Sequence, residues 1–163
     1  MTDGLVFWFT GLSGAGKTTL ANGCKERLIS QGLKTAILDG DDVRRRLHRH
    51  LGFTEPEIKE NNRLVCKLCE TERQMADIVL VPIISPYRES RELARRILSP
   101  GFYEIYLHAD IKELERRDTK LLYAQARSGE IDNLIGYSDK APYELAEAPD
   151  WSADTGQEPT DET

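Results

Sequence analysis

Long apolar runs are missing from this sequence, which excludes a helix that spans a membrane. The most apolar stretch covers residues 78–84, far short of the ~20 residues needed to cross a bilayer. The N-terminus has no basic stretch followed by an apolar segment, so no signal peptide is evident. Cysteine is also scarce: three residues in 163 do not build a disulfide scaffold, and they favour a reducing compartment. We therefore expect a cytoplasmic protein without a membrane partner.

A surplus of positive charge is missing as well. Lys and Arg number 22 against 28 Asp and Glu, a net charge of −6, whereas sequence-independent nucleic-acid binding needs cations that neutralise phosphates. The excess is uneven, because seven acids and no bases lie in residues 144–163, and without them 22 bases face 21 acids. We expect no nucleic-acid partner, and we interpret the basic cluster at 44–46 as an attraction for a small anionic substrate.

What the sequence does contain is a regular alternation of strand and helix patterns. Short β-branched and aromatic runs predict buried strands, and apolar residues at helical spacing predict helices between them. We predict strands at 5–10, 35–39, 78–84 and 102–107, and helices at 18–31, 42–51, 56–76, 89–98 and 113–128, the last one interrupted. The helix at 56–76 is expected to face inward through Ile58, Val65, Leu68, Cys69 and Met75.

This alternation indicates an α/β domain with three layers, in which a mostly parallel central sheet is flanked by helices. We assign residues 1–150 to this domain. The polar and acidic residues 151–163 are expected to form a disordered tail.

A phosphate-binding motif follows the first predicted strand. Residues 11–18 read G-L-S-G-A-G-K-T and match G-x-x-x-x-G-K-[ST] at every fixed position, with a strand before and a helix after. The glycines let backbone N–H groups surround phosphate oxygens, and the helix N-terminus adds positive potential. We therefore predict a P-loop NTPase fold with ATP and Mg²⁺ as cofactors. The expected ATP ligands in this loop are Gly11, Ser13, Gly14, Ala15, Gly16, Lys17, Thr18 and Thr19.

The class of P-loop protein follows from what accompanies the loop. A GTPase would carry an N-K-x-D motif, which is absent, and an ABC-type ATPase would be longer. Phosphoryl transfer to a small acceptor fits the size, and it calls for a mobile basic lid that excludes water. The segment 116–120 is a suitable lid, with Arg117 as a further ATP ligand and Lys120 beside it, although a solvated helix face would also explain these charges.

Two carboxylates follow the second predicted strand. Asp39 and Asp41 come where open α/β sheets place their ligands, at the carboxyl ends of strands. They are suited to hold Mg²⁺ and to accept a proton from the acceptor. We expect Thr18 and Asp39 at the metal and Lys17 and Asp41 in catalysis.

Taken together, these pieces resemble the adenylylsulfate (APS) kinase family. The matching text is F-W-F-T-G-L-S-G-A-G-K-T-T (7–19), L-D-G-D-D-V-R (38–44), L-G-F (51–53), E-N-N-R (60–63), I-S-P-Y-R (84–88), R-D-T-K-L-L-Y-A-Q-A-R-S-G-E-I (117–131) and P-Y-E-L-A-E-A-P (142–149). The resemblance covers roughly residues 5 to 150 in the family's order. It implies ATP-dependent phosphorylation of the 3′-hydroxyl of adenylylsulfate, which gives 3′-phosphoadenylylsulfate.

The resemblance also implies roles for single residues. Asp41 would stand near the acceptor hydroxyl, and Phe53 would stack on the adenine of the acceptor. In some bacterial relatives the serine that matches Ser85 carries phosphate, but direct transfer needs no such intermediate. Ser85 is therefore interpreted first as a binding residue, and it is also a candidate catalytic residue beside Lys17 and Asp41. The acceptor ligands implied in this way are Arg44, Phe53, Asn61, Ile84, Ser85, Lys120 and Leu134.

The acceptor half departs from the family pattern at several points. The position of a family arginine that holds the anionic substrate is Ile58 here, with Lys59 next to it, and a family phenylalanine is Leu134. A genuine but divergent APS kinase, with Lys59 and Leu134 compensating, is the favoured reading. A paralogue acting on another nucleotide conjugate, such as cytidine diphosphoramidate, and a non-catalytic nucleotide-binding regulator remain open.

The C-terminus also departs from the family pattern. Family members continue into a last strand, whose start residues 151–155 resemble, and then into a packing helix that this sequence lacks. A sheet face left partly exposed would favour association, so we expect a homodimer.

Overall fold

The fold is a single twisted sheet with helices on both faces. The computed structural model describes residues 3–118 and 120–157. Its strands are β1 (Leu5–Thr10), β2 (Thr35–Ile37), β3 (Ile78–Pro82), β4 (Phe102–His108) and β5 (Trp151–Asp154). Its helices are α1 (Lys17–Ser30), α2 (Gly40–Arg46), α3 (Glu55–Glu72), α4 (Arg88–Leu98), α5 (Ile111–Arg117) and α6 (Leu122–Ser128).

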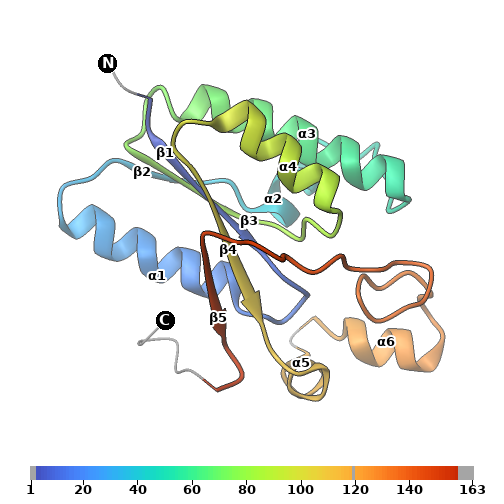
Figure 1. The fold of residues 1–163 in the computed structure, drawn as a ribbon. Helices are drawn as coiled ribbons and strands as arrows, with labels where there is room; N and C mark the ends of the chain where they lie inside the picture. Colours follow the sequence, from blue (N-terminus) through green and yellow to red (C-terminus); the bar gives the residue numbers. More distant parts are fainter. Residues whose placement is uncertain (1–2, 119, 158–163) are drawn as a thin grey trace.

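All five strands are parallel, in the order β2-β3-β1-β4-β5. The helices α2, α3 and α4 lie on one face of the sheet and α1 on the other, while α5 and α6 follow the carboxyl end of β4 (Figure 1). The three-layer α/β prediction is confirmed. The central position of β1 places the loop after it in the middle of the carboxyl edge, where ligands of such sheets bind.

Alternate side chains of β1 enter two separate hydrophobic cores, as the period of a strand requires. Val6 and Trp8 are fully buried against α3 and α4, together with Val79 and Val81 of β3. Phe9 faces the other way, into the core that α1 covers. A strand buried on both faces reads as a continuous apolar run, which is why the sequence pattern located β1 and β3 correctly.

The long helix α3 begins with a capping box. The Thr54 backbone N–H donates to Glu57 Oε2 at 3.1 Å, and Pro56 occupies the first turn, where its missing N–H costs nothing. Ile58, Val65 and Cys69 are buried as predicted. Met75 is not: α3 ends at Glu72, and the Met75 side chain is 67% exposed. The chain turns before it completes the predicted face.

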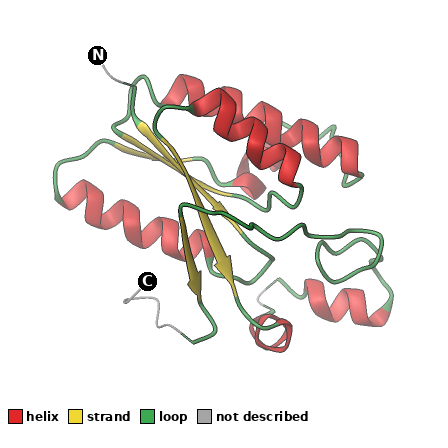
Figure 2. Cartoon of the chain, in the orientation of Figure 1, coloured by secondary structure: helices red, strands yellow, loops and turns green. Residues whose placement is uncertain are grey.

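The predicted disordered tail is wrong for its first residues. Residues 151–154 form β5, which extends the sheet beside β4 with Tyr106 opposite Ser152 and His108 opposite Asp154. Residues 158–163 of that tail lie outside the described residues. Figure 2 shows the strands of this sheet, the helices around it and the loops that connect them. No described helix combines the length and the apolar character needed to cross a membrane.

Candidate active site

The loop after β1 is shaped by its glycines. A Cβ at Gly11 would lie 2.1 Å from the carbonyl oxygen of Leu107, so only glycine fits there. Gly16 caps α1 with φ +91°, a left-handed conformation that side chains disfavour. The loop therefore turns sharply from the sheet into α1 and presents its backbone at the helix N-terminus, where an anion is attracted.

Lys17, the first residue of α1, folds back over this loop. Its ammonium donates a hydrogen bond to the carbonyl oxygen of Leu12 at 2.7 Å. Burial and the nearby Lys120 ammonium lower the pKa of Lys17 from 10.5 to about 7, while the carboxylates of Asp41 and Asp39 oppose this shift. A cation held in such a position is ready to exchange the carbonyl for phosphate oxygens.

Two oxygen ligands of the kind that Mg²⁺ prefers meet beside the loop. The Thr18 hydroxyl donates to Asp39 Oδ2 at 2.8 Å. The other oxygen, Asp39 Oδ1, accepts from the backbone N–H groups of Asp41 and Asp42 and so caps α2. The cap fixes the carboxylate against the loop. The described residues hold no group of three or more His, Cys, Asp or Glu that would bind a metal unaided.

Asp41, in the first turn of α2, forms an ion pair with Lys120 of the predicted lid. Both side chains are more than half exposed, so the pair is open to solvent and, like other exposed ion pairs, contributes little to stability. Its significance is positional, because it joins the carboxylate proposed from the sequence to the basic segment that follows α5.

A pocket of about 350 Å³ connects these groups. Of the residues singled out from the sequence it is lined by Ser13, Gly14, Gly16, Lys17, Thr18, Thr19, Asp39, Asp41, Ile84, Arg117 and Lys120. Gly11 and Ala15 are buried in the turn beneath it. The structure thus brings Lys17, Asp41, the two expected metal ligands and most of the expected ATP ligands to one cavity.

Thr155 also lines this pocket, and the sequence analysis missed it. Its hydroxyl donates to the carbonyl oxygen of Ala15 at 2.9 Å, and its backbone carbonyl accepts from Arg117 Nη2 at 2.5 Å. Arg117 also reaches the carbonyl oxygen of Gly14 at 3.3 Å. A single threonine in an acidic segment has no feature that marks it as a site residue. The strand formed by the residues directly before it would have placed it at the carboxyl edge of the sheet.

The expected acceptor ligands lie mostly outside this cavity. Phe53 is 56% exposed, and the Arg44 guanidinium lies 4.6 Å from the centre of its ring. Arg44 also donates to the carbonyl oxygens of Leu51 and Gly52, at 3.1 and 2.6 Å. This aromatic and cationic pair leaves one face of the ring open to a planar ligand.

Asn61 is positioned by a buried histidine, His48. Asn61 Oδ1 lies 2.8 Å from His48 Nδ1, and both residues are buried. The contact fixes the orientation of the Asn61 amide, and Asn61 does not line the pocket.

Two predicted acceptor residues do not present their side chains to the pocket. Ser85 is 0% exposed, and its hydroxyl has no hydrogen-bond partner among the residues that the structure describes. Leu134 is buried in the core that α1 covers, near Leu107 and Tyr123. The neighbouring Ile84 carries the pocket wall instead.

The compensation proposed for the lost arginine is also not seen. Ile58 is buried, and Lys59 turns away to form ion pairs with Glu55 and Glu89, each at 2.7 Å. These two carboxylates raise the pKa of Lys59. The ammonium is therefore engaged between α3 and α4, and Lys59 does not line the pocket.

The comparisons with known proteins agree with this geometry. Residues 3–154 match the model of the family described as "Adenylylsulphate kinase". The adenylyl-sulfate kinase of Halothermothrix orenii is 45% identical over 98% of this chain and 85% of its own, and that of Prochlorococcus marinus is 43% identical over 97% and 78%. The structure of Mycobacterium tuberculosis APS kinase in complex with AMPPNP and APS superposes with a TM-score of 0.90 at 35% identity, covering 99% of this chain and 94% of that one. The chain belongs to the adenylylsulphate kinase family.

Proposed function

We propose that this protein transfers the γ-phosphoryl group of ATP to the 3′-hydroxyl of adenylylsulfate. The proposal rests on one observation: the loop residues Lys17 and Thr18 line the same pocket as Asp41 and Lys120. Its small-molecule partners would be two nucleotides, and the related Mycobacterium tuberculosis structure contains two such molecules, AMPPNP and APS.

The chemistry assigns one task to each group. The loop amides and Lys17 hold the β- and γ-phosphates and stabilise the charge that develops during transfer. Asp41 accepts the proton of the acceptor hydroxyl while the oxygen of that hydroxyl forms a bond to the γ-phosphorus. The bond between that phosphorus and the oxygen bridging to the β-phosphate breaks, and ADP leaves with the electron pair.

The Mg²⁺ ion that this reaction uses fits the residues present. Mg²⁺ takes one or two carboxylates together with substrate phosphates and water, and the Thr18 hydroxyl and Asp39 carboxylate, 2.8 Å apart, supply protein ligands of that kind. When bound, the ion neutralises charge on the phosphates. Thr18 and Asp39 would orient it beside the loop.

A second candidate is supported by the acceptor half. Neither Ile58 nor Lys59 offers a cation to the pocket, so the site has fewer fixed charges for an anionic acceptor than the family pattern provides. Another nucleotide conjugate, such as cytidine diphosphoramidate, is the alternative. A regulator without activity is disfavoured, because Asp39 and Asp41 both line the pocket beside the loop.

A coupled assay of ADP release separates these functions. Adenylylsulfate should give acceptor-dependent ADP, and cytidine diphosphoramidate should give little. Lys17→Ala is the control for nucleotide chemistry, since it should remove ADP release with every acceptor. Turnover with the diphosphoramidate alone would support the paralogue, whereas ATP binding without turnover on any acceptor would support the regulator.

We also propose that the chain forms a homodimer through an uncovered part of the sheet. Leu5, Tyr103 and Trp151 lie on the side of the sheet that carries α1, since the register pairs Phe7 with Tyr103 and Ile105 with Trp151. Leu5 is 38% exposed, and Tyr103 and Trp151 are each 41% exposed. Light scattering at micromolar concentration should give twice the mass of a single chain. The Tyr103→Glu variant should give the mass of a single chain. A monomeric wild type would contradict the proposal.

A cytoplasmic location is proposed on the state of the cysteines. Cys24, Cys66 and Cys69 carry free thiols, and burial raises the pKa of Cys66 to about 12, which makes its thiol inert. Free thiols of this kind are typical of reducing compartments.

A further inference from the structure

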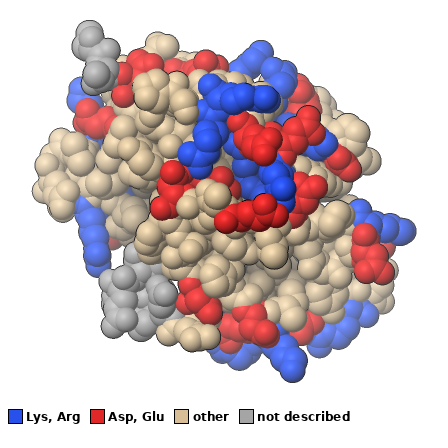
Figure 3. Space-filling model, viewed as in Figure 1, with Lys and Arg blue, Asp and Glu red and all other residues tan. Residues whose placement is uncertain are grey.

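A row of arginines on α4 holds the segment that leads into β5. Arg88, Arg91 and Arg95 lie at spacings of three and four residues, which places them on one face of the helix. We call residues 142–150 the strap; it crosses in front of β4 below α4 (Figure 1). Over this region basic and acidic side chains alternate at the surface (Figure 3).

The outer contacts of the strap are exposed ion pairs. Arg88 Nη2 donates to Glu147 Oε1 at 2.5 Å, and Arg95 Nη2 donates to Asp150 Oδ2 at 2.6 Å. Pairs of this kind contribute little to stability, about 0–1 kcal/mol each. They fix where the strap lies without touching the pocket.

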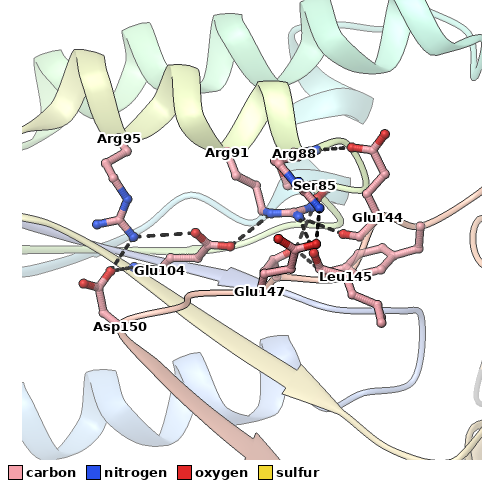
Figure 4. Close-up of polar contacts among 11 residues, drawn as sticks. Ser85, Arg88, Arg91, Arg95, Glu104, Glu144, Leu145, Glu147 and Asp150 are labelled. Carbon is pink, nitrogen blue, oxygen red and sulfur yellow. Dashed lines mark hydrogen bonds and ion pairs between the residues drawn. The ribbon is translucent and has the colours of Figure 1, made fainter.

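Arg91, at the centre of the row, is different because its side chain is only 3% exposed. Its Nε faces Glu104 Oε1 at 3.0 Å, and its Nη2 donates to the carbonyl oxygens of Glu144 and Leu145 at 2.7 and 3.2 Å. Its Nη1 donates to the carbonyl oxygen of Ser85 at 2.6 Å. All three nitrogens of the guanidinium are thus engaged, each in a different direction (Figure 4).

The bond to Ser85 connects this buried group to the pocket. Ser85 follows Ile84, which lines the pocket, and precedes the turn into α4. The Thr10 hydroxyl also donates to the Ser85 carbonyl, but at 3.4 Å. The same hydroxyl forms a shorter hydrogen bond, of 2.8 Å, with the hydroxyl of Tyr143. Arg91 therefore provides the shortest of the described hydrogen bonds to this carbonyl.

We propose that Arg91 is a positioning residue for phosphoryl transfer: by joining the Ser85 carbonyl to the strap, it sets the place of Ile84 on the acceptor side of the pocket. The inference rests on the proposed function, since it assigns the wall to the acceptor. Arg91 itself does not line the pocket. Its effect passes through the backbone of residues 84–85, so loss of the contact displaces the wall and weakens acceptor binding while the ATP loop stays in place.

A lysine at position 91 retains the positive charge but loses the planar guanidinium with its several N–H donors. Glu104 would keep a cation opposite it, which matters because removal of one partner from a buried ion pair is strongly destabilising. A single ammonium on a flexible stem does not span the Glu104 carboxylate, the strap carbonyls and the Ser85 carbonyl together. Arg91→Lys is therefore the variant that separates positioning from simple charge.

The test compares Arg91→Lys with Arg95→Lys in the full chain. Arg95 is the matched control, because it also faces Glu104, at 3.6 Å, and holds the strap through Asp150 without a described contact to Ser85. With adenylylsulfate and ATP as substrates, Arg91→Lys should raise KM for the acceptor about tenfold, the size expected when hydrogen bonds from a charged donor are lost. KM for ATP should stay within twofold, and Arg95→Lys should leave both values within twofold.

Three results would overturn the inference. Unchanged KM values in Arg91→Lys with only a lower Tm would show that the residue serves stability alone. An equal rise of the acceptor KM in Arg95→Lys would show that strap docking in general is responsible. A wild type without acceptor-dependent turnover would refute the proposed function and the inference with it, so the two failures are distinguishable.

A second variant covers the case in which Arg91→Lys does not fold. The pair Arg91→Gln and Glu104→Gln removes both charges together and keeps polar groups at both positions, so neither charge is left buried alone. Its acceptor KM should rise as in Arg91→Lys. An unchanged acceptor KM in the folded double variant would refute the positioning role.

Discussion

Binding of ATP should draw a proton from solvent onto Lys17. In the free protein the pKa of this side chain is about 7, so about 90% of the molecules carry a neutral amine at pH 8 and about 10% do so at pH 6. Triphosphate beside the ammonium raises the pKa, because opposite charge favours the charged form. Binding is therefore accompanied by uptake of about 0.9 proton at pH 8 and about 0.1 at pH 6, and affinity weakens as pH rises above 7.

Titration calorimetry in buffers of different ionisation enthalpy measures this uptake as the slope of binding enthalpy against buffer enthalpy. Lys17→Arg is the control, because arginine keeps its charge over the whole range and so isolates the contribution of the lysine from that of the nucleotide. A slope that does not change between pH 6 and pH 8, or the same uptake in Lys17→Arg, would refute the reasoning.

Three further predictions follow from single contacts. Asp41→Asn should lower kcat by about 10²–10⁴-fold and leave ATP binding within a few fold, as measured by ADP release and nucleotide titration; retained turnover would exclude Asp41 as the base. Thr155→Val removes the hydrogen bond to the Ala15 carbonyl and should raise KM for ATP about fivefold, whereas a change confined to the acceptor KM would place Thr155 elsewhere. Leu98→Ala, in the fully buried core beneath α4, should reduce the free energy of unfolding by about 2–5 kcal/mol in urea titration; a loss below ~1 kcal/mol would indicate that the site collapses around the smaller side chain.

The central sheet was predictable because its strands carry their own signal. Val6, Trp8 and Val81 belong to the apolar runs that predicted the strands, and all three are buried. The loop motif begins where β1 ends. The two carboxylates Asp39 and Asp41 were also located correctly, since strand ends in a parallel sheet meet at one edge.

What sequence reasoning missed depends on partners that are far away in the chain. Only Ala153 of β5 is buried, so the strand has almost no apolar signal of its own. The likeness of residues 151–155 to the family's last strand indicated it, and it forms because β4 offers an unpaired edge. The bond between Thr155 and Ala15 joins residues 140 apart. The burial of Ser85 and the engagement of Lys59 by Glu89 likewise arise from packing against α4, which a local pattern does not reveal.

The contact between Thr155 and Ala15 has a consequence for synthesis on the ribosome. The phosphate-binding loop is made well before the residue that completes the wall beside it, because Thr155 is translated 140 residues later than Ala15. At about 5–20 residues per second this delay is roughly 7–28 s. Once β4 and Arg117 have been made, β4 is still without β5 beside it, and Arg117 is still without the carbonyl that it later holds. Until Thr155 is made, the nascent chain therefore carries its nucleotide loop in a form that lacks one wall of the pocket.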